Sequence, residues 1–292
     1  MKKQKNTAYI SKNAYDETKD LIRQNGYNII EVNFPSRVSK PVCTHPDIYM
    51  CKIEFPNINN NSRFFYGDIT KLGNKHPGEA IYNACATGKY FVHNLKISDS
   101  KILDWAEQNA LEFVDVPQGY TRCNLLPVGP SNFITSDRGI FKAMSKSGAD
   151  VLLISNNNIS LPGYDYGFLA GCAGIISSNL DLENPNSEQA FSDYGFSLSS
   201  IYGVSEISSE KYTVLFNGDL SAHPDFKKII DYISNCGLNA LWVRGKKLAD
   251  IGSILCTESD ASCERSEILC EETYVSGTKL DSDNLQTESE VI

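Results

Sequence analysis

Phe65-Tyr66-Gly67-Asp68-Ile69, followed by His76-Pro77, and Phe216-Asn217-Gly218-Asp219-Leu220, followed by His223-Pro224, are two copies of one pattern. In each copy an apolar run ends at Gly-Asp, a short loop follows, and His-Pro opens a stretch with helical spacing. Proline suits the first helical position because its φ is fixed and it lacks an amide hydrogen. A pattern that recurs along a chain predicts a repeated structural unit.

A looser form of this pattern occurs five times. An extended run ends in a small residue, usually followed by Asp, at Ser11-Lys12, Gly67-Asp68, Ser98-Asp99, Ser136-Asp137 and Gly218-Asp219. A predicted helix follows each junction: Ala14–Gln24, Pro77–Ala86, Ser100–Asn109, Gly139–Ser147 and Pro224–Cys236. A predicted strand then follows each helix: Tyr27–Val32, Lys89–Leu95, Leu111–Val116, Asp150–Ser155 and Leu238–Val243. Four of the helices are predicted to end at a glycine, namely Gly26, Gly88, Gly148 and Gly237. The fold class is therefore α/β, built from repeated strand–helix–strand units.

The rest of the chain divides into a domain and a tail. Ile48–Phe55, Cys123–Val128 and Tyr212–Phe216 are further predicted strands, and the polar stretch from Asn179 to Ser200 is a predicted surface insertion. Residues 1–256 form the predicted α/β domain. Residues 257–292 form an acidic tail without hydrophobic periodicity, which we expect to pack little against the domain.

Charge and composition exclude several classes of function. The formal net charge is −9, and the tail, with ten acidic and two basic residues, carries −8 of it. The domain is nearly neutral and shows no basic cluster, so we expect no nucleic-acid partner. The longest nearly apolar run, Phe168–Ile176, is about half of what a membrane span needs, so we expect no membrane partner.

The cysteines and the known ligand motifs point to a cytoplasmic protein without a metal or cofactor. The nine cysteines are scattered, and none forms a CxxC or a Cys/His group with zinc spacing. Free cysteines are typical of a reducing compartment. No GxGxxG, GxxxxGK[ST] or HExxH motif occurs, so the sequence predicts no nucleotide cofactor and no zinc hydrolase.

The chain resembles the guanidine-group-modifying enzymes, and within their fold it is most similar to an uncharacterised bacterial family with no assigned reaction. The resemblance covers roughly residues 7–256. It is carried by His45-Pro46-Asp47-Ile48, Tyr120–Asn124, Phe133–Asp137, Leu161–Gly167 and Ile251–Leu255. It implies the pentein fold, a five-fold pseudosymmetric α/β propeller in which five ββαβ units close around a central site. An open doubly wound α/β sheet is the alternative.

The resemblance also implies a chemistry. In those enzymes a cysteine thiolate near the C-terminus attacks the guanidinium carbon, a histidine acts as acid and base, and carboxylates hold the planar cation. By position the nucleophile is Cys256, which follows Gly252 at the close of the last unit. The family's His-x-Asp loop reads Gly163-Tyr164-Asp165 here, so Asp165 is retained but the histidine is missing. His45, close to Asp47, is the candidate replacement, because a nearby carboxylate can orient an imidazole.

Two other cysteines compete with Cys256 for the role of nucleophile. Cys172 lies in an apolar stretch, where burial holds a thiol neutral. Cys123 adjoins Arg122, but neighbours in a predicted strand point to opposite faces, so that charge would not activate it.

The candidate ligand-binding residues are Asp47, Arg122 and Asp137. The four aspartates at the strand–helix junctions, Asp68, Asp99, Asp137 and Asp219, are predicted N-caps. In a closed ring the strand ends approach the axis, and Asp137 is then the best candidate to line a central site. Arg122 would suit a carboxylate on the ligand.

These observations predict a protein that binds a small cation or zwitterion. Its enzymatic form would be a cysteine-dependent hydrolase acting on a guanidino or amino-acid-like compound. The alternative is a non-catalytic binding or scaffold protein of the same fold. The enzyme hypothesis requires that Cys256, His45 and Asp165 reach one bound ligand, and the binding-protein hypothesis does not.

Overall fold

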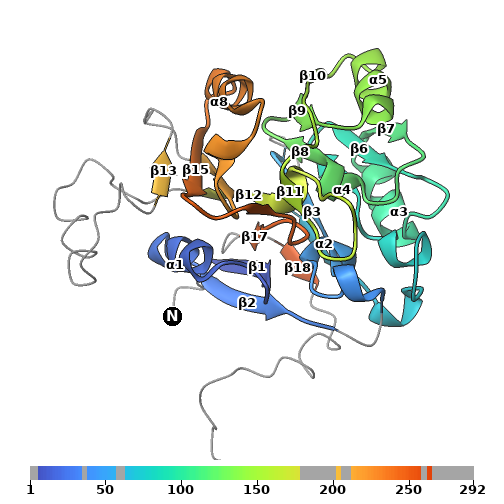
Figure 1. The fold of residues 1–292 in the computed structure, drawn as a ribbon. Helices are drawn as coiled ribbons and strands as arrows, with labels where there is room; N and C mark the ends of the chain where they lie inside the picture. Colours follow the sequence, from blue (N-terminus) through green and yellow to red (C-terminus); the bar gives the residue numbers. More distant parts are fainter. Residues whose placement is uncertain are drawn as a thin grey trace, which may run out of the picture.

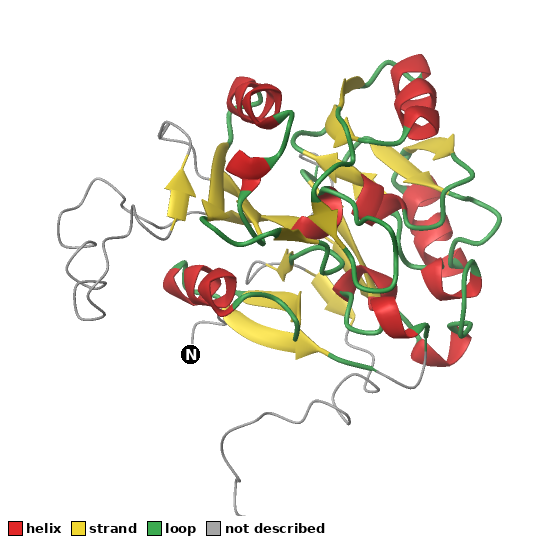
Figure 2. Cartoon of the chain, in the orientation of Figure 1, coloured by secondary structure: helices red, strands yellow, loops and turns green. Residues whose placement is uncertain are grey.

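The computed structural model describes residues 6–34, 38–56, 63–177, 202–204, 212–257 and 262–264. In these ranges the chain is a mixed α/β protein, as the sequence predicts, and its strands form five separate sheets (Figures 1 and 2). Within the same ranges, no helix combines the length and the apolar character that crossing a membrane requires. The predicted insertion between Asn179 and Ser200 lies outside the described residues, as does most of the acidic tail.

One three-stranded arrangement recurs through the molecule. A lead strand pairs antiparallel with a middle strand, the chain crosses over through a helix, and a last strand pairs parallel with the middle strand. In the order lead, middle, crossing helix and last, the four complete sets are β5 (Cys85–Thr87), β6 (Tyr90–His93), α3 (Ser100–Gln108) and β7 (Glu112–Asp115); β8 (Leu125–Pro127), β9 (Asn132–Thr135), α5 (Arg138–Lys146) and β10 (Asp150–Leu153); β12 (Ala173–Ser177), β14 (Tyr212–Phe216), α8 (Phe226–Asn235) and β15 (Asn239–Val243); and β17 (Leu255–Thr257), β1 (Thr7–Ser11), α1 (Asp16–Gln24) and β2 (Asn28–Val32). The four helices lie at the periphery of the molecule, with the strands on their inner side (Figure 1).

A fifth set has the same strand order but a different connection. Lead strand β3 (Met50–Glu54) pairs antiparallel with β4 (Arg63–Tyr66), and β18 (Ser262–Glu264) pairs parallel with β4 in the position of the last strand. This last strand comes from the predicted tail, so the expectation of weak packing is limited to the tail residues beyond it.

The prediction of a helix over Pro77–Ala86 is wrong. Within that range the chain forms only the short 3-10 turn η3 (Gly78–Ala80), and the end of the predicted helix is strand β5. A second 3-10 turn, η2 (Ile69–Lys71), precedes the range. Two tertiary interactions outweigh the helical propensity of this run. Glu79 is buried and accepts hydrogen bonds from Ser39 and Tyr120, and β5 pairs with both β3 and β6.

The remaining elements are short. β11 (Ile159–Ser160) pairs with β16 (Leu248–Ala249), and β13 (Tyr202–Val204) pairs with β15. One-turn helices or 3-10 turns are η1 (Lys40–Val42), α2 (Pro46–Tyr49), α4 (Thr121–Asn124), η4 (Ala170–Cys172) and η5 (Leu220–Ala222). Helices α2 and α4 stand where the sequence predicted the first residues of strands, so these two strand starts were predicted too early.

The predicted helix ends are largely confirmed. All four junction aspartates act as N-caps, because each accepts a hydrogen bond from a backbone amide two residues ahead. Gly26, Gly148 and Gly237 follow helices with φ of +85°, +78° and +73°, which is the left-handed conformation that glycine tolerates best. Gly88 does not end a helix, since it follows strand β5.

The core lies between the peripheral helices and the sheets. Each long helix buries one face: Leu21 and Ile22 of α1, Ile140 and Met144 of α5, and Ile229 and Ile233 of α8 are at most 1% exposed. Full burial of such a side chain stabilises the fold by about 1.5–3 kcal/mol. The helices therefore serve packing, and the polar chemistry lies elsewhere.

Candidate functional site

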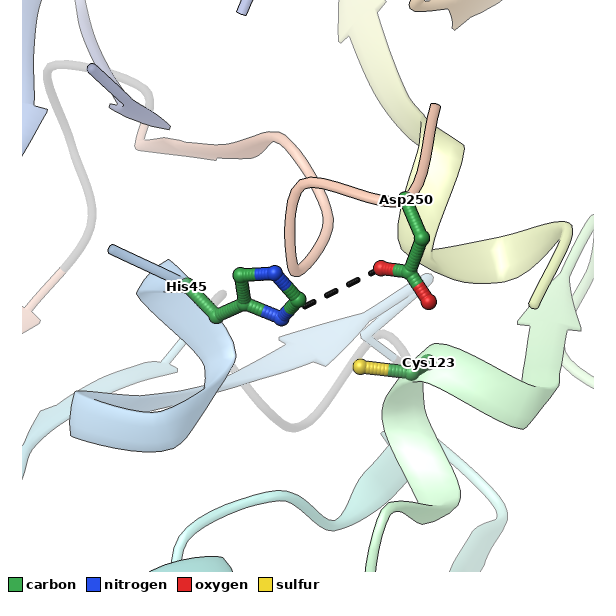
Figure 3. Close-up of side chains that lie close together, drawn as sticks. All are labelled: His45, Cys123 and Asp250. Carbon is green, nitrogen blue, oxygen red and sulfur yellow. Dashed lines mark ion pairs between the residues drawn. The ribbon is translucent and has the colours of Figure 1, made fainter. Parts of the chain in front are cut away.

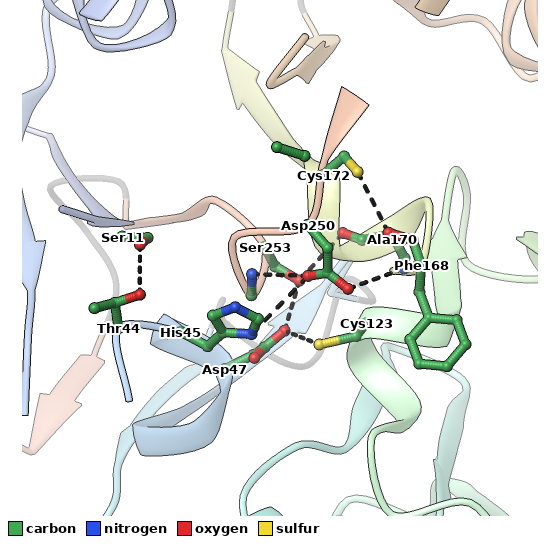
Figure 4. Close-up of polar contacts among 12 residues, drawn as sticks. Ser11, Thr44, His45, Asp47, Cys123, Phe168, Ala170, Cys172, Asp250 and Ser253 are labelled. Atoms are coloured by element: carbon green, nitrogen blue, oxygen red, sulfur yellow. Dashed lines mark hydrogen bonds and ion pairs between the residues drawn. The ribbon is translucent and has the colours of Figure 1, made fainter. Parts of the chain in front are cut away.

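The segments that lead into the five lead strands carry buried polar or thiol side chains. One such residue stands shortly before each lead strand: Asp47 before β3, Asn83 before β5, Cys123 before β8, Cys172 before β12 and Ser253 before β17. None is more than 3% exposed. Figure 4 shows that four of the five lead-in segments, those before β3, β8, β12 and β17, meet in one place, although they are far apart in the sequence. The fifth joins them through Asn83, which donates a hydrogen bond to the Cys123 sulfur and accepts one from the Cys123 amide.

Asp47 is the hub of the hydrogen bonds between these segments. Its Oδ2 accepts from the Cys123 thiol at 2.9 Å and from the Ser253 hydroxyl at 2.8 Å (Figure 4). The Nδ2 of Asn83 donates to the Cys123 sulfur at 3.6 Å, and its Oδ1 accepts from the Cys123 amide at 3.4 Å. These bonds fix the Cys123 side chain from two sides.

His45, Cys123 and Asp250 form a compact cluster beside this network. Their donor atoms all lie within 4.8 Å of one another, and His45 Nδ1 is 3.9 Å from Asp250 Oδ1 (Figure 3). His45 is the N-cap residue of α2, Cys123 belongs to α4, and Asp250 follows β16. Among the described residues, Nδ1 of the buried His45 has no hydrogen-bond partner. The His45 imidazole, the Cys123 thiol and the Asp250 carboxylate therefore lie close together without a hydrogen bond between any two of them.

Two glycines allow the backbone to approach this cluster. A Cβ on Gly252, whose φ is +72°, would lie 2.1 Å from the Cβ of His45. A Cβ on Gly171 would lie 2.0 Å from Asp250 Oδ1. Backbone amides then hold the carboxylate, because Gly252 N donates to Asp250 Oδ1 at 3.1 Å and Phe168 N donates to Oδ2 at 2.9 Å.

Burial controls the protonation of the cluster. It lowers the pKa of His45 to about 3 and is the main cause that raises the pKa of Asp250 to about 7, with the charge of Asp47 adding to the rise. Burial, and then the carboxylates Asp47 and Asp250, raise the pKa of the Cys123 thiol well above its usual value. All three shifts favour neutral groups, and a bound cation would favour the deprotonated thiol and carboxylate instead.

Two cavities border the cluster, and His45 and Asp250 line both. The smaller cavity, of about 410 Å³, is the one that Cys123 lines. Its other main lining residues are mostly aromatic or carry a carboxylate: His45, His76, Tyr120, Tyr164, Asp165, Tyr166, Phe168 and Asp250. The larger, of about 600 Å³, is bordered by the polar side chains of Ser11, Asn13, Lys40 and Thr44. Both volumes are in the range of small-molecule sites.

The structure brings some of the predicted site residues together. His45 and the exposed Asp165 line the smaller cavity, and Asp47 holds Cys123. Cys123 lies in helix α4 and not in the predicted strand, so the argument that Arg122 and Cys123 point to opposite faces of a strand does not apply.

Other predicted site residues lie elsewhere. Cys256 is in β17, where it packs in the apolar cluster with Ala8 and Ile10, and it lines neither cavity. Asp137 caps α5 and also lines neither cavity. Arg122 is buried beside the site, with Glu54 Oε1 3.9 Å from its Nη2. Catalysis by Cys256 and ligand binding by Asp137 or Arg122 stay predictions.

Sequence reasoning missed Asp250, Ser253 and Asn83. The sequence analysis looked for site residues at the strand–helix junctions. The buried polar centre, formed by the hydrogen-bonded lead-in residues and the His45, Cys123 and Asp250 cluster, lies instead mainly at the segments before the lead strands. The available signal was a polar residue or a thiol directly ahead of each apolar lead strand, as in Asn83-Ala84-Cys85 and Ser253-Ile254-Leu255.

Comparison with known proteins gives one match. The profile of a family of unknown function (DUF6873) matches residues 9–183 and 191–255, which is most of the chain, and the chain belongs to this family. His45, Asp47, Cys123, Asp250 and Ser253 all lie in the matched ranges. No curated protein and no solved structure matches the chain.

Proposed function

We propose that this member of the family is a cysteine-dependent enzyme that hydrolyses a carbon–nitrogen bond in a small cationic compound of the guanidine or amidine type. Cys123 is the nucleophile and His45 the acid and base. The observation that carries the proposal is the meeting of the Cys123 thiol, the His45 imidazole and the Asp250 carboxylate at the wall of one cavity.

The proposal includes a five-fold pseudosymmetric α/β propeller. It is supported by the recurrence of one strand order in five sets and by the hydrogen bonds that connect their lead-in segments at one polar centre. A ring of repeated units places equivalent segments around an axis, and a ligand on that axis touches several of them.

A planar cation is the substrate class that suits the smaller cavity. Asp165 and Asp250 supply carboxylates that pair with a guanidinium or amidinium group. Tyr120, Tyr164 and Tyr166 supply aromatic faces, which attract cations. The cavity of about 410 Å³ suits a ligand of the size of an amino acid.

The reaction proceeds in two displacements. The Cys123 sulfur attacks the central carbon of the cation while the thiol proton moves to His45. His45 then protonates the departing amine as its carbon–nitrogen bond breaks. A water attacks the thioether-linked intermediate, His45 accepts its proton, and the proton returns to sulfur as the carbon–sulfur bond breaks.

Alkylation with 2-chloroacetamidine near neutral pH, followed by peptide mapping, tests the proposal. We expect Cys123 to be labelled first, and labelling of that peptide to be lost in Cys123→Ser and slowed in His45→Gln. Iodoacetamide, which is neutral but of similar size, is the matched reagent, and it should show less preference for Cys123. Preferential labelling of Cys256 by the cationic reagent would refute Cys123 as the nucleophile and support Cys256, the nucleophile that the sequence predicts.

A non-catalytic binding protein is the second candidate. It is favoured by the hydrogen bond from the Cys123 thiol to Asp47 and by the raised pKa of that thiol, which keep the sulfur protonated. Such a protein would bind arginine-like compounds in a calorimetric titration without labelling Cys123 and without turnover.

A further inference from the structure

The three donor atoms at the cluster are of the kinds that zinc ions bind in proteins. Zinc binds imidazole nitrogen, cysteine sulfur and carboxylate oxygen, and His45, Cys123 and Asp250 offer one of each. They are separated by 78 and 127 residues, so no spacing motif announces them in the sequence. We infer that these three side chains form a binding site for a zinc ion, reached through the smaller cavity.

The distances fit a metal ion. A zinc ion at its usual bond lengths holds neighbouring ligand atoms roughly 3.4–3.8 Å apart. His45 Nδ1 and Asp250 Oδ1 are already 3.9 Å apart, and every pair of donor atoms in the cluster is within 4.8 Å. Zinc binding therefore requires the Cys123 sulfur to leave its hydrogen bond to Asp47 and to move towards His45 and Asp250.

His45 gives the independent indication of a missing partner. Its side chain is 4% exposed, and its Nδ1, which faces Asp250, has no hydrogen-bond partner among the described residues (Figure 3). A separation of 3.9 Å is too long for a hydrogen bond between the two groups. Buried polar atoms are normally paired, so an unpaired nitrogen aimed at a carboxylate marks a place for a ligand.

The charges balance when zinc binds. Zinc displaces the thiol proton as the Zn–S bond forms, together with the carboxyl proton of Asp250 in those molecules that carry one. The dication, one thiolate and one carboxylate then sum to zero, which removes the cost of burying a net charge. Three protein ligands leave a fourth position for water from the cavity.

The metal site stands on this geometry alone, but its consequence for activity rests on the proposed function. Zinc occupies the sulfur that attacks the substrate and the imidazole that moves the proton. Micromolar zinc therefore inhibits the hydrolase, and a chelator restores it.

Titration of the reduced, metal-free protein with Co²⁺ tests the site directly. We expect the near-ultraviolet sulfur-to-cobalt charge-transfer band, its displacement by Zn²⁺, and release of between about one and two protons per zinc at neutral pH. Mg²⁺ should have no effect, because it prefers oxygen ligands.

Three variants and one control complete the test. Cys123→Ser should abolish the charge-transfer band, and His45→Gln and Asp250→Asn should each weaken zinc binding at least tenfold. Cys236→Ser is the matched control, because Cys236 lies at the end of α8 away from both cavities, and it should bind as the parent protein does.

The outcomes separate the two proposals. Absence of the band, or its persistence in Cys123→Ser, overturns the metal site whatever the activity. Metal binding without any labelling or turnover leaves the metal site standing and refutes the hydrolase. Turnover that zinc does not inhibit refutes the inhibitory role alone.

Discussion

Gly252 determines how closely the last lead-in segment approaches His45. Replacing it with alanine adds a Cβ 2.1 Å from the His45 Cβ and forces a side chain into a φ of +72°. We expect Gly252→Ala to lower the free energy of unfolding by about 2–4 kcal/mol, the sum of overpacking and left-handed strain. Urea denaturation measures this change.

Gly148→Ala is the matched control for that variant. Gly148 has a φ of +78°, but a Cβ there has no atom within 4 Å. Only the backbone cost of about 1–2 kcal/mol applies. Equal losses in the two variants would show that the close approach to His45 does not constrain the site.

His93 makes stability depend on pH. It is fully buried, its Nε2 lies 2.9 Å from the Gly119 carbonyl, and burial lowers its pKa to about 4. In the unfolded chain its pKa is about 6.5, so the unfolded chain binds a proton first as the pH falls. The contribution to stability is present above pH 6.5 and is lost between pH 6.5 and about 4, by about 3 kcal/mol in total.

Unfolding free energies at pH 7.5 and pH 5 check this dependence. His93→Gln should reduce the loss of stability between pH 7.5 and pH 5 relative to the parent protein. The lowered pKa of His45 acts with the same sign and the raised pKa of Asp250 with the opposite sign, and both groups are present in parent and variant. An unchanged slope in His93→Gln would contradict the assignment to His93.

At the scale of elements, a substitution of Asp137 distinguishes a helix-capping role of this residue from a ligand-binding role. Its carboxylate accepts hydrogen bonds from the amides of Gly139 and Ile140 at the start of α5. We expect Asp137→Ala to cost about 1 kcal/mol of stability and to leave the affinity for arginine-like ligands unchanged. Thermal unfolding and calorimetry measure the two effects.

Asp165→Ala is the counterpart of that variant. Asp165 is exposed and lines the smaller cavity, so its loss should weaken ligand binding with little change in melting temperature. The reverse pattern, with binding lost in Asp137→Ala alone, would restore Asp137 as the ligand-binding residue that the sequence predicted.

The longer elements were readable from the sequence because their signals are local. The helices α1, α3, α5 and α8 carry helical spacing, and three of the four have a terminal glycine with positive φ. The one-turn helices α2 and α4 were not readable, because four residues are too few to establish a period. Because α4 could not be predicted, the sequence did not show which way the Cys123 side chain points.

At the scale of the whole molecule, strand β18 connects the tail to the domain. Ser262–Glu264 pairs parallel with β4, which would otherwise present an open edge. We expect truncation after Glu258 to remove this strand and to lower the melting temperature by about 2–4 °C, equivalent to about 1 kcal/mol. Truncation after Arg265 keeps the strand and is the control. An identical melting temperature for both would restore the original expectation of a tail that adds nothing.

The candidate site itself could be predicted only in part. His45 and Asp47 stood out by residue type and local pattern, and Asp165 stood out through the resemblance to the guanidine-group-modifying enzymes. Asp250 did not, because its importance comes from lying beside His45, about 200 residues away in the sequence. Local spacing carries no information about which distant lead-in segments share one centre.

The pairing of β17 with β1, which sets Thr257 opposite Thr7, has a consequence for the order of synthesis. The set that contains β1 and β2 stays unfinished until its lead strand β17 has been made, long after the other two strands. His45, Asp47 and Cys123 are made early, but Asp250 and Ser253 follow Cys123 by 127 and 130 residues. At roughly 5–20 residues per second this delay lasts on the order of 6–26 seconds, during which the nascent chain contains Cys123 but neither Asp250 nor Ser253. Translation products that end before Asp250 therefore contain His45, Asp47 and Cys123 without the Asp250 and Ser253 part of the site.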